Sequence, residues 1–166
     1  MNTRMLIPGT LLAFTALAAL KPSAAARIGE AEVREGPRGG PCFTIGAREE
    51  KLGIPNFQSL VVMDGPRLVW KLTTPRERTF ALSAGMCVPY GGKVAALPRT
   101  QAAELVPGRI YNLRIEARPG VRGAAQLAYH GRFCLVRQPD GSARVRQLPA
   151  TEQAGRPAVE CSPASY

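Results

Sequence analysis

Hydrophobic and polar residues alternate with a period of two along most of the chain, which is typical of half-buried antiparallel strands. The clearest example is the segment 109–117. Its apolar and polar side chains fall on opposite faces: Tyr111, Leu113, Ile115 and Ala117 against Asn112, Arg114 and Glu116. Residues 67–73 follow the same pattern, so we expect Trp70 in the core on the same face as Leu68 and Leu72.

Turn motifs between these apolar runs predict two hairpins. Asp64-Gly65-Pro66 separates residues 59–63 from 67–73, and Pro139-Asp140-Gly141 separates 133–136 from 143–148. Proline presets φ and glycine tolerates positive φ, so both motifs favour tight connections.

Other segments complete the predicted secondary structure. Further strands are expected over 41–47 and 79–83, and residues 126–129 are expected to extend or flank the strand that carries Cys134. A helix is predicted only over 99–106, where Pro98 and Pro107 limit it to one or two turns.

About seven short strands at this spacing predict an all-β fold, namely a disulfide-stabilised antiparallel β-sandwich that is loosely Ig-like. The sandwich is assigned to residues 41–149. A polar lead-in over 27–40, in which 31–34 can form an edge strand, precedes it, and a Pro-rich tail over 150–166 follows.

Residues 1–26 have the features of a secretory signal peptide. Arg4 precedes an apolar run over residues 5–20, and three alanines at 24–26 suit signal peptidase, with Arg27 as the first mature residue. The alternative is an uncleaved anchor, but the run is shorter than the roughly 20 residues that span a bilayer. The sequence therefore predicts a periplasmic or secreted protein with no stable membrane span after cleavage.

Four cysteines lie in the predicted mature chain: Cys42, Cys87, Cys134 and Cys161. An even number in a small exported domain favours two disulfides, and the absence of a C-x-x-C pair argues against a zinc ribbon or a redox motif. Three pairings are possible. We favour Cys87–Cys134 between two strands, with Cys42–Cys161 joining the two ends of the domain.

The chain is basic, with 22 Lys plus Arg against 12 Asp plus Glu, and 18 of the basic residues are arginine. This bias either reflects genome composition or provides a surface for an acidic partner. For the second case Arg114, Arg144 and Arg146 are the predicted partner-binding residues, because each falls on an outward strand face. The arginines do not cluster and no nucleic-acid-binding motif is present, so nucleic acid is not an expected partner.

Candidate catalytic chemistry is sparse, and we predict no enzyme, cofactor or metal site. His130 is the one histidine, and a nucleophilic pair with Cys134 would need a free thiolate. The run Glu49-Glu50-Lys51 is interpreted as a solvated loop, and Glu116 has no second acid nearby in sequence. Tyr90 is weighed as a ligand-loop residue and as part of a disulfide-anchored turn, and the turn is favoured.

The landmark residues resemble those of small bacterial extracytoplasmic proteins, some of which are described as periplasmic immunity lipoproteins of type VI secretion systems. The resemblance covers residues 41–148. It depends on Pro41-Cys42-Phe43-Thr44-Ile45, Trp70, Cys87-Val88-Pro89-Tyr90-Gly91, Leu105-Val106-Pro107-Gly108-Arg109-Ile110-Tyr111, Tyr129 and Phe133-Cys134. This chain departs from the group in lacking the cysteine to which a lipid would be attached.

Together these features predict a non-enzymatic exported domain that binds another protein. The resemblance implies an immunity or inhibitor protein that neutralises a secreted toxin. The basic charge favours an acidic partner, and the expected mechanism is occlusion by loops or an edge strand of a rigid sandwich. The alternative is a periplasmic module that binds a glycan, a small molecule or an anionic polymer.

Overall fold

The computed structural model describes residues 28–75, 77–92, 98–120, 128–149 and 161. The predicted signal segment, and all of the predicted tail except Cys161, lie outside these residues. The strands and the single helix in the described part are β1 (Gly29–Glu35), β2 (Pro41–Ile45), α1 (Ala47–Leu52), β3 (Asn56–Asp64), β4 (Arg67–Thr73), β5 (Val88–Pro89), β6 (Ile110–Arg118), β7 (Ala128–Arg137) and β8 (Ala143–Leu148). Within this described part, no helix has the length and apolar character needed to cross a membrane.

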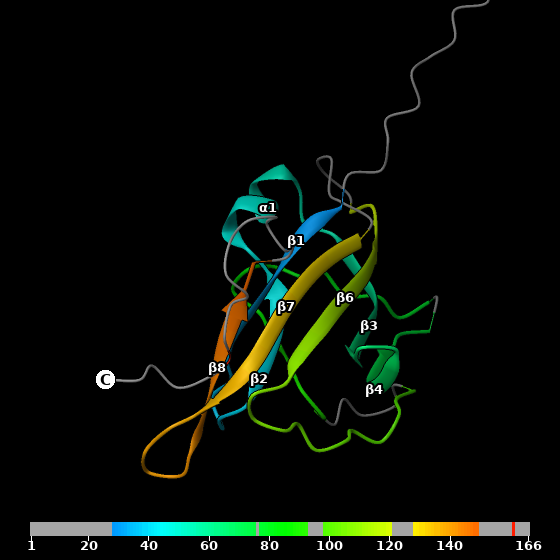
Figure 1. Cartoon of the computed structure of the whole chain (residues 1–166). Coiled ribbons are helices and arrows are strands. Elements are labelled where there is room, and N and C mark those ends of the chain that lie inside the picture. Colours follow the sequence, from blue (N-terminus) through cyan, green and yellow to red (C-terminus); the bar gives the residue numbers. More distant parts are fainter. Residues whose placement is uncertain (1–27, 76, 93–97, 121–127, 150–160, 162–166) are drawn as a thin grey trace, which may run out of the picture.

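The strands form one curled sheet in the order β4-β3-β6-β7-β1-β2-β5, with β8 paired to β7 (Figure 1). The predicted all-β class is confirmed. The sheet is mixed, however, because β1 runs parallel to β7 where Gly29 and Glu30 pair with Tyr129 and His130. The purely antiparallel arrangement was therefore wrong at this one pairing.

Strand β1 lies inside the region that the sequence assigned to a polar lead-in. It pairs with β7 over two residues and then with β2 over Ala31–Glu35, so it is an interior strand and not an edge strand. Buried and more exposed residues do alternate in β1: Ala31 and Val33 are buried, and Glu30, Glu32 and Arg34 lie on the opposite face. The strand has few large apolar residues, so the pattern is weak in the sequence.

Both predicted hairpins are present as β3–β4 and β7–β8. Gly65 has a φ of 55° in the first turn, a conformation that glycine adopts without strain. Trp70 is buried as predicted, but Leu68 is exposed and Val69 is buried instead. The cause is a bulge in β4, where Val62 pairs with Trp70 and Met63 with Leu68, so that Val69 is the extra residue.

Two predicted elements are absent from the described residues. Residues 79–83 form no strand and contribute an isolated bridge from Ala81 to Asn56. The predicted helix over 99–106 is extended, because its backbone pairs with the edge of β4. Thr100 N donates to Lys71 O at 2.9 Å and Ala103 N donates to Val69 O at 3.0 Å.

The main core lies inside the curl and is rich in aromatic rings. Phe43 from β2 contacts Phe133 from β7 and Trp70 from β4, with ring centroids 5.4 and 6.3 Å apart, and Phe133 stacks on Tyr111 from β6. These contacts join strands from both ends of the sheet order, so the rings hold the curl closed.

Two disulfides are present, as predicted, but their pairing differs from the prediction. Cys42 is bonded to Cys87, and Cys134 to Cys161. Pairing of β2 with β5 places Cys42 opposite Pro89 and so brings Cys87 close. Cys134 faces away from the main core into a small second cluster with Cys161. The bridges join residues 45 and 27 positions apart, for which loop entropy predicts roughly 3–4 kcal/mol of stabilisation each.

Candidate ligand-binding site

A cavity of about 650 Å³ lies where strands β1 and β8 separate along the same edge of β7. Strand β1 leaves β7 after His130, whereas β8 pairs with β7 from Arg132 onward, and α1 lies near the start of β1 (Figure 1). The lining residues come from these four elements and their flanks: Ile28, Gly29, Glu30, Ala31, Glu32, Gly46, Arg48, Glu49, His130, Gln147 and Pro149.

Gln147 holds the two diverging strands together beside the cavity. Its Oε1 accepts a hydrogen bond from Val33 N at 2.8 Å, and its Nε2 donates to Ala31 O at 3.3 Å. The side chain thereby joins β8 to β1 beyond the point where β1 and β7 pair.

Glu49 is buried at the cavity wall, although the charged run Glu49-Glu50-Lys51 favoured a solvated loop. The residue lies in α1 and is 6% exposed. Its Oε2 has no hydrogen-bond partner among the described residues. Oε2 packs closely against Gly29, where a Cβ would lie 2.9 Å from this oxygen and 2.5 Å from the Tyr129 ring, so only glycine allows this approach.

His130 projects from β7 on the same side as Glu30 of β1 and Arg114 of β6, which are its neighbours in register. Burial, followed by the positive charge of Arg114, lowers the pKa of His130 below its ordinary value. The imidazole is therefore neutral at pH 7, with one nitrogen as donor and the other as acceptor. Its Nε2 is buried and without a partner in the described part of the chain.

The charge of the cavity wall is opposite to that of the whole protein. Glu30, Glu32 and Glu49 contribute three carboxylates, and Arg48 is the one arginine among the described lining residues. Glu32 is partly neutralised by Arg34, whose Nε lies 3.5 Å from its Oε1. A chain with a net charge of +10 thus carries an acidic recess.

The available chemistry is hydrogen bonding and ion pairing. The described part of the chain contains no group of three or more His, Cys, Asp or Glu side chains placed to hold a metal ion. Cys134 is four residues beyond His130 on β7 and is disulfide-bonded, so it offers His130 no thiolate. Glu49 and His130 line the cavity, and each has a buried polar atom, Oε2 and Nε2, with no hydrogen-bond partner among the described residues.

The three arginines predicted to bind a partner share the outer face of the sheet without forming a cluster. Arg114 lies beside His130 and pairs with Glu116 at 3.1 Å. Arg144 and Arg146 are exposed on β8, next to Val136 and Cys134, which are six and four residues further along β7. Arg114 therefore lies four or more residues along β7 from Arg144 and Arg146.

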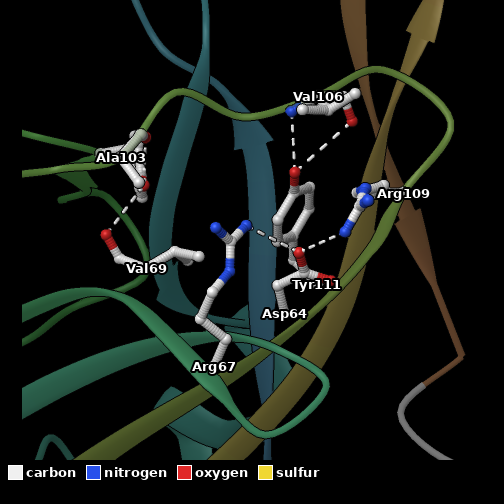
Figure 2. Close-up of polar contacts among 8 residues, drawn as sticks. Asp64, Arg67, Val69, Ala103, Val106, Arg109 and Tyr111 are labelled. Atoms are coloured by element: carbon white, nitrogen blue, oxygen red, sulfur yellow. Dashed lines mark hydrogen bonds and ion pairs between the residues drawn. The ribbon is translucent and has the colours of Figure 1, made fainter.

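A second polar group, at the β3–β4 turn, has a structural role. Asp64 Oδ2 accepts hydrogen bonds from Arg67 Nη2 at 2.9 Å and Arg109 Nη1 at 2.8 Å (Figure 2). These bonds, that from Arg67 first, lower the pKa of Asp64. Beside them, Val106 N donates to the Tyr111 hydroxyl at 2.7 Å, which pins the loop that precedes β6 (Figure 2).

Tyr90 also serves the fold, in keeping with the favoured interpretation of its loop as a disulfide-anchored turn. Its hydroxyl donates to Ala103 O at 2.7 Å, and its ring packs edge-on against Trp70. Burial raises the pKa of Tyr90 to about 12, so the hydroxyl keeps its proton and remains a donor.

Sequence reasoning missed Glu30, Glu32, Glu49 and Gln147 as site residues. They lie on β1, α1 and β8, and the parallel pairing of residues one hundred positions apart brings them together. No local motif encodes that pairing. The immunity role suggested by resemblance stays a prediction, because neither a family model nor a curated protein nor a solved structure matches this chain.

Proposed function

We propose that this protein is a non-enzymatic, exported binding domain whose cavity between α1, β1, β7 and β8 holds a small polar molecule. One observation carries the proposal: Glu49 and His130 both line the cavity, and each has a buried polar atom, Oε2 and Nε2, that finds no hydrogen-bond partner in the described part of the chain. Leaving a buried polar atom unpaired costs about 1–3 kcal/mol, and a ligand that pairs with it recovers that cost. A cavity of this size is within the usual range for small-molecule sites.

Export is part of the proposal, and two features of the chain support it. Both disulfides are of a kind that persists outside the cytoplasm. The signal-like segment over residues 1–26 supports release into the periplasm or medium. A rigid, loosely Ig-like β-sandwich is the architecture we propose around the site, and the aromatic contacts across the curl support it.

The test uses the fact that the chain has one histidine and one tryptophan. His130 lines the cavity and Trp70 is buried in the core, so their NMR signals report the site and the fold separately. Titration with glucose, glucosamine and glucuronate offers neutral, cationic and anionic heads on frames of equal size. We expect at least one probe to shift the His130 imidazole saturably while the Trp70 indole stays in place. No saturable His130 shift with any of the three would overturn the proposal.

A second candidate function, capture of an acidic protein, is favoured by the geometry of β8. Val145 packs against the main core, so its neighbours Arg144 and Arg146 both turn to the outer face. An immunity protein for a secreted toxin is the specific version, and the resemblance alone supports it. Association with the protein encoded by the neighbouring gene should slow several-fold in Arg144→Glu at low salt. The exposed turn residue Arg38, replaced by Glu, is the matched control, and equal slowing of both variants would remove β8 from the proposal.

A further inference from the structure

We propose that the ligand of the cavity is a zwitterion, either a free amino acid or a short peptide, whose ammonium group pairs with Glu30 and whose carboxylate pairs with Arg48. This inference rests on the proposed function, because it specifies the chemistry of the molecule that enters the same cavity. Its starting point is a pair of exposed, oppositely charged side chains that line one cavity from different elements.

The charges that a ligand can meet in the cavity are fewer than the charged residues that line it. Glu49 is 6% exposed and its Oε2 packs against β1, so little of its carboxylate is open to the cavity. Glu32 already has a partner, since Arg34 Nε lies 3.5 Å from its Oε1. Glu30 and Arg48 are exposed and lack ion-pair partners in the described part of the chain. The cavity therefore offers one open negative and one open positive charge.

The backbone fixes these two charges on separate elements. Glu30 lies on β1 opposite His130 and projects with it to the outer face of the sheet. Arg48 lies in α1, just after Gly46, which also lines the cavity. Although both side chains face one cavity, they form no ion pair with each other. A molecule with a charge of each sign can bridge the two, and it would be oriented with its ammonium toward β1 and its carboxylate toward α1.

A zwitterion gains from both charges, whereas a singly charged molecule gains from one and is repelled by the other. The guanidinium of Arg48 presents a planar fork that suits a carboxylate, and the carboxylate of Glu30 accepts hydrogen bonds from an ammonium. Bonds of this kind are stronger than those between neutral groups. His130 is neutral at pH 7 and so does not disturb the balance of charge. Neutral molecules gain neither charge-assisted bond.

A free amino acid and a short peptide share this chemistry, and probes of different length distinguish them. A cavity of about 650 Å³ has room for both, and each extended residue adds about 3.3–3.6 Å between the charged ends. Glycine, glycylglycine and triglycine are titrated at pH 7, and the His130 imidazole reports binding. We expect one length to bind at least threefold more tightly than the others, because β1 and α1 hold the charges at a set separation. Equal binding of all three, or no binding, would overturn the inference.

The need for both charges is tested with the best-binding length in three forms: unblocked, acetylated at the amine, and amidated at the carboxylate. We expect the unblocked form to bind at least tenfold more tightly than either blocked form, since each block removes a charge-assisted hydrogen bond. Equal or tighter binding of a blocked form, with hexoses still shifting His130, would overturn the zwitterion and leave the cavity a binding site. A His130 signal unmoved by every hexose and every glycine probe would overturn both proposals.

The two residues are tested with Glu30→Gln and Arg48→Gln, which remove exposed charges and should leave folding intact, as Trp70 signals will check. Each variant should bind the unblocked form about tenfold more weakly. Glu30→Gln should also weaken the amidated form but not the acetylated one, and Arg48→Gln should do the reverse. Glu35→Gln on β1 and Lys51→Gln in α1 are exposed, lie outside the described cavity lining and should bind normally. Unchanged binding of the unblocked form in either cavity variant contradicts the inference.

Discussion

Two carboxylates of this protein have environments opposite to the usual expectation. Asp64 is at the end of β3, near the surface, and has two arginine partners. Glu49 in α1 is almost completely buried and has an oxygen with none among the described residues. Buried charges in proteins are normally paired, whereas exposed ones rely on water.

The ion pairs of Asp64 stabilise the fold, whereas the unpaired carboxylate of Glu49 does not. The ion pairs of Asp64 fasten the β3–β4 turn to the loop before β6, and they are exposed enough that each contributes little. Glu49 makes the folded state less stable as long as its oxygen stays unpaired. A residue that costs stability in the empty site is more readily explained by binding than by folding.

The largest effect is expected from closing the space beside Glu49. Gly29→Ala places a Cβ 2.5 Å from the buried Tyr129 ring and 2.9 Å from Glu49 Oε2, so the free energy of unfolding should fall by about 1–3 kcal/mol. Gly85→Ala is the control, because its nearest neighbour, Ser83 Oγ, is 4.0 Å away. Urea denaturation measures both. Equal stability of the two variants would show that the approach of Gly29 to Glu49 is not tight.

Removing the charge of Glu49 or of Asp64 is expected to change stability by a smaller amount, and in opposite directions for the two residues. Glu49→Met replaces an unpaired buried carboxylate with an apolar chain of similar length and should raise the free energy of unfolding by about 1 kcal/mol. Asp64→Asn weakens two ion pairs and should lower the melting temperature slightly. Thermal denaturation in the absence of added ligand measures both. A loss of stability in Glu49→Met would mean that the carboxylate has a stabilising partner.

The smallest effect is expected in the dependence of stability on pH, because His130 and Asp64 should titrate in separate pH ranges. Because the pKa of His130 is lowered from 6.5, the unfolded chain binds a proton that the folded protein does not, and stability declines as pH falls from 6.5 toward the folded-state pKa. The pKa of Asp64 is lowered from 3.8, so its contribution is present above 3.8 and lost as pH falls through its folded-state value.

Denaturation across this pH range, with variants, assigns each decline. His130→Gln should remove the decline that begins near pH 6.5, and Asp64→Asn should reduce only the one that begins near 3.8. If His130→Gln left the stability profile unchanged, His130 would have the same pKa in the folded and unfolded states.

The sequence by itself determined most strands and their turns. The alternation in β6 predicted which side chains are buried, and the glycine-containing turns predicted both hairpins, because these features depend on neighbours two to four residues apart. It also predicted two disulfides from the number of cysteines, and a buried Trp70.

Only the tertiary structure decided which distant segments meet. The bulge at Val69 moved Leu68 out of the core, the pairing of β2 with β5 selected Cys87 as the partner of Cys42, and the edge of β4 made residues 99–106 extended. The cavity likewise depends on β1 leaving β7 beside His130. The physical reason is the same in each case. Strand edges and apolar surfaces that are far apart in the chain can pair in several ways, and the packing of the whole molecule determines which pairs form.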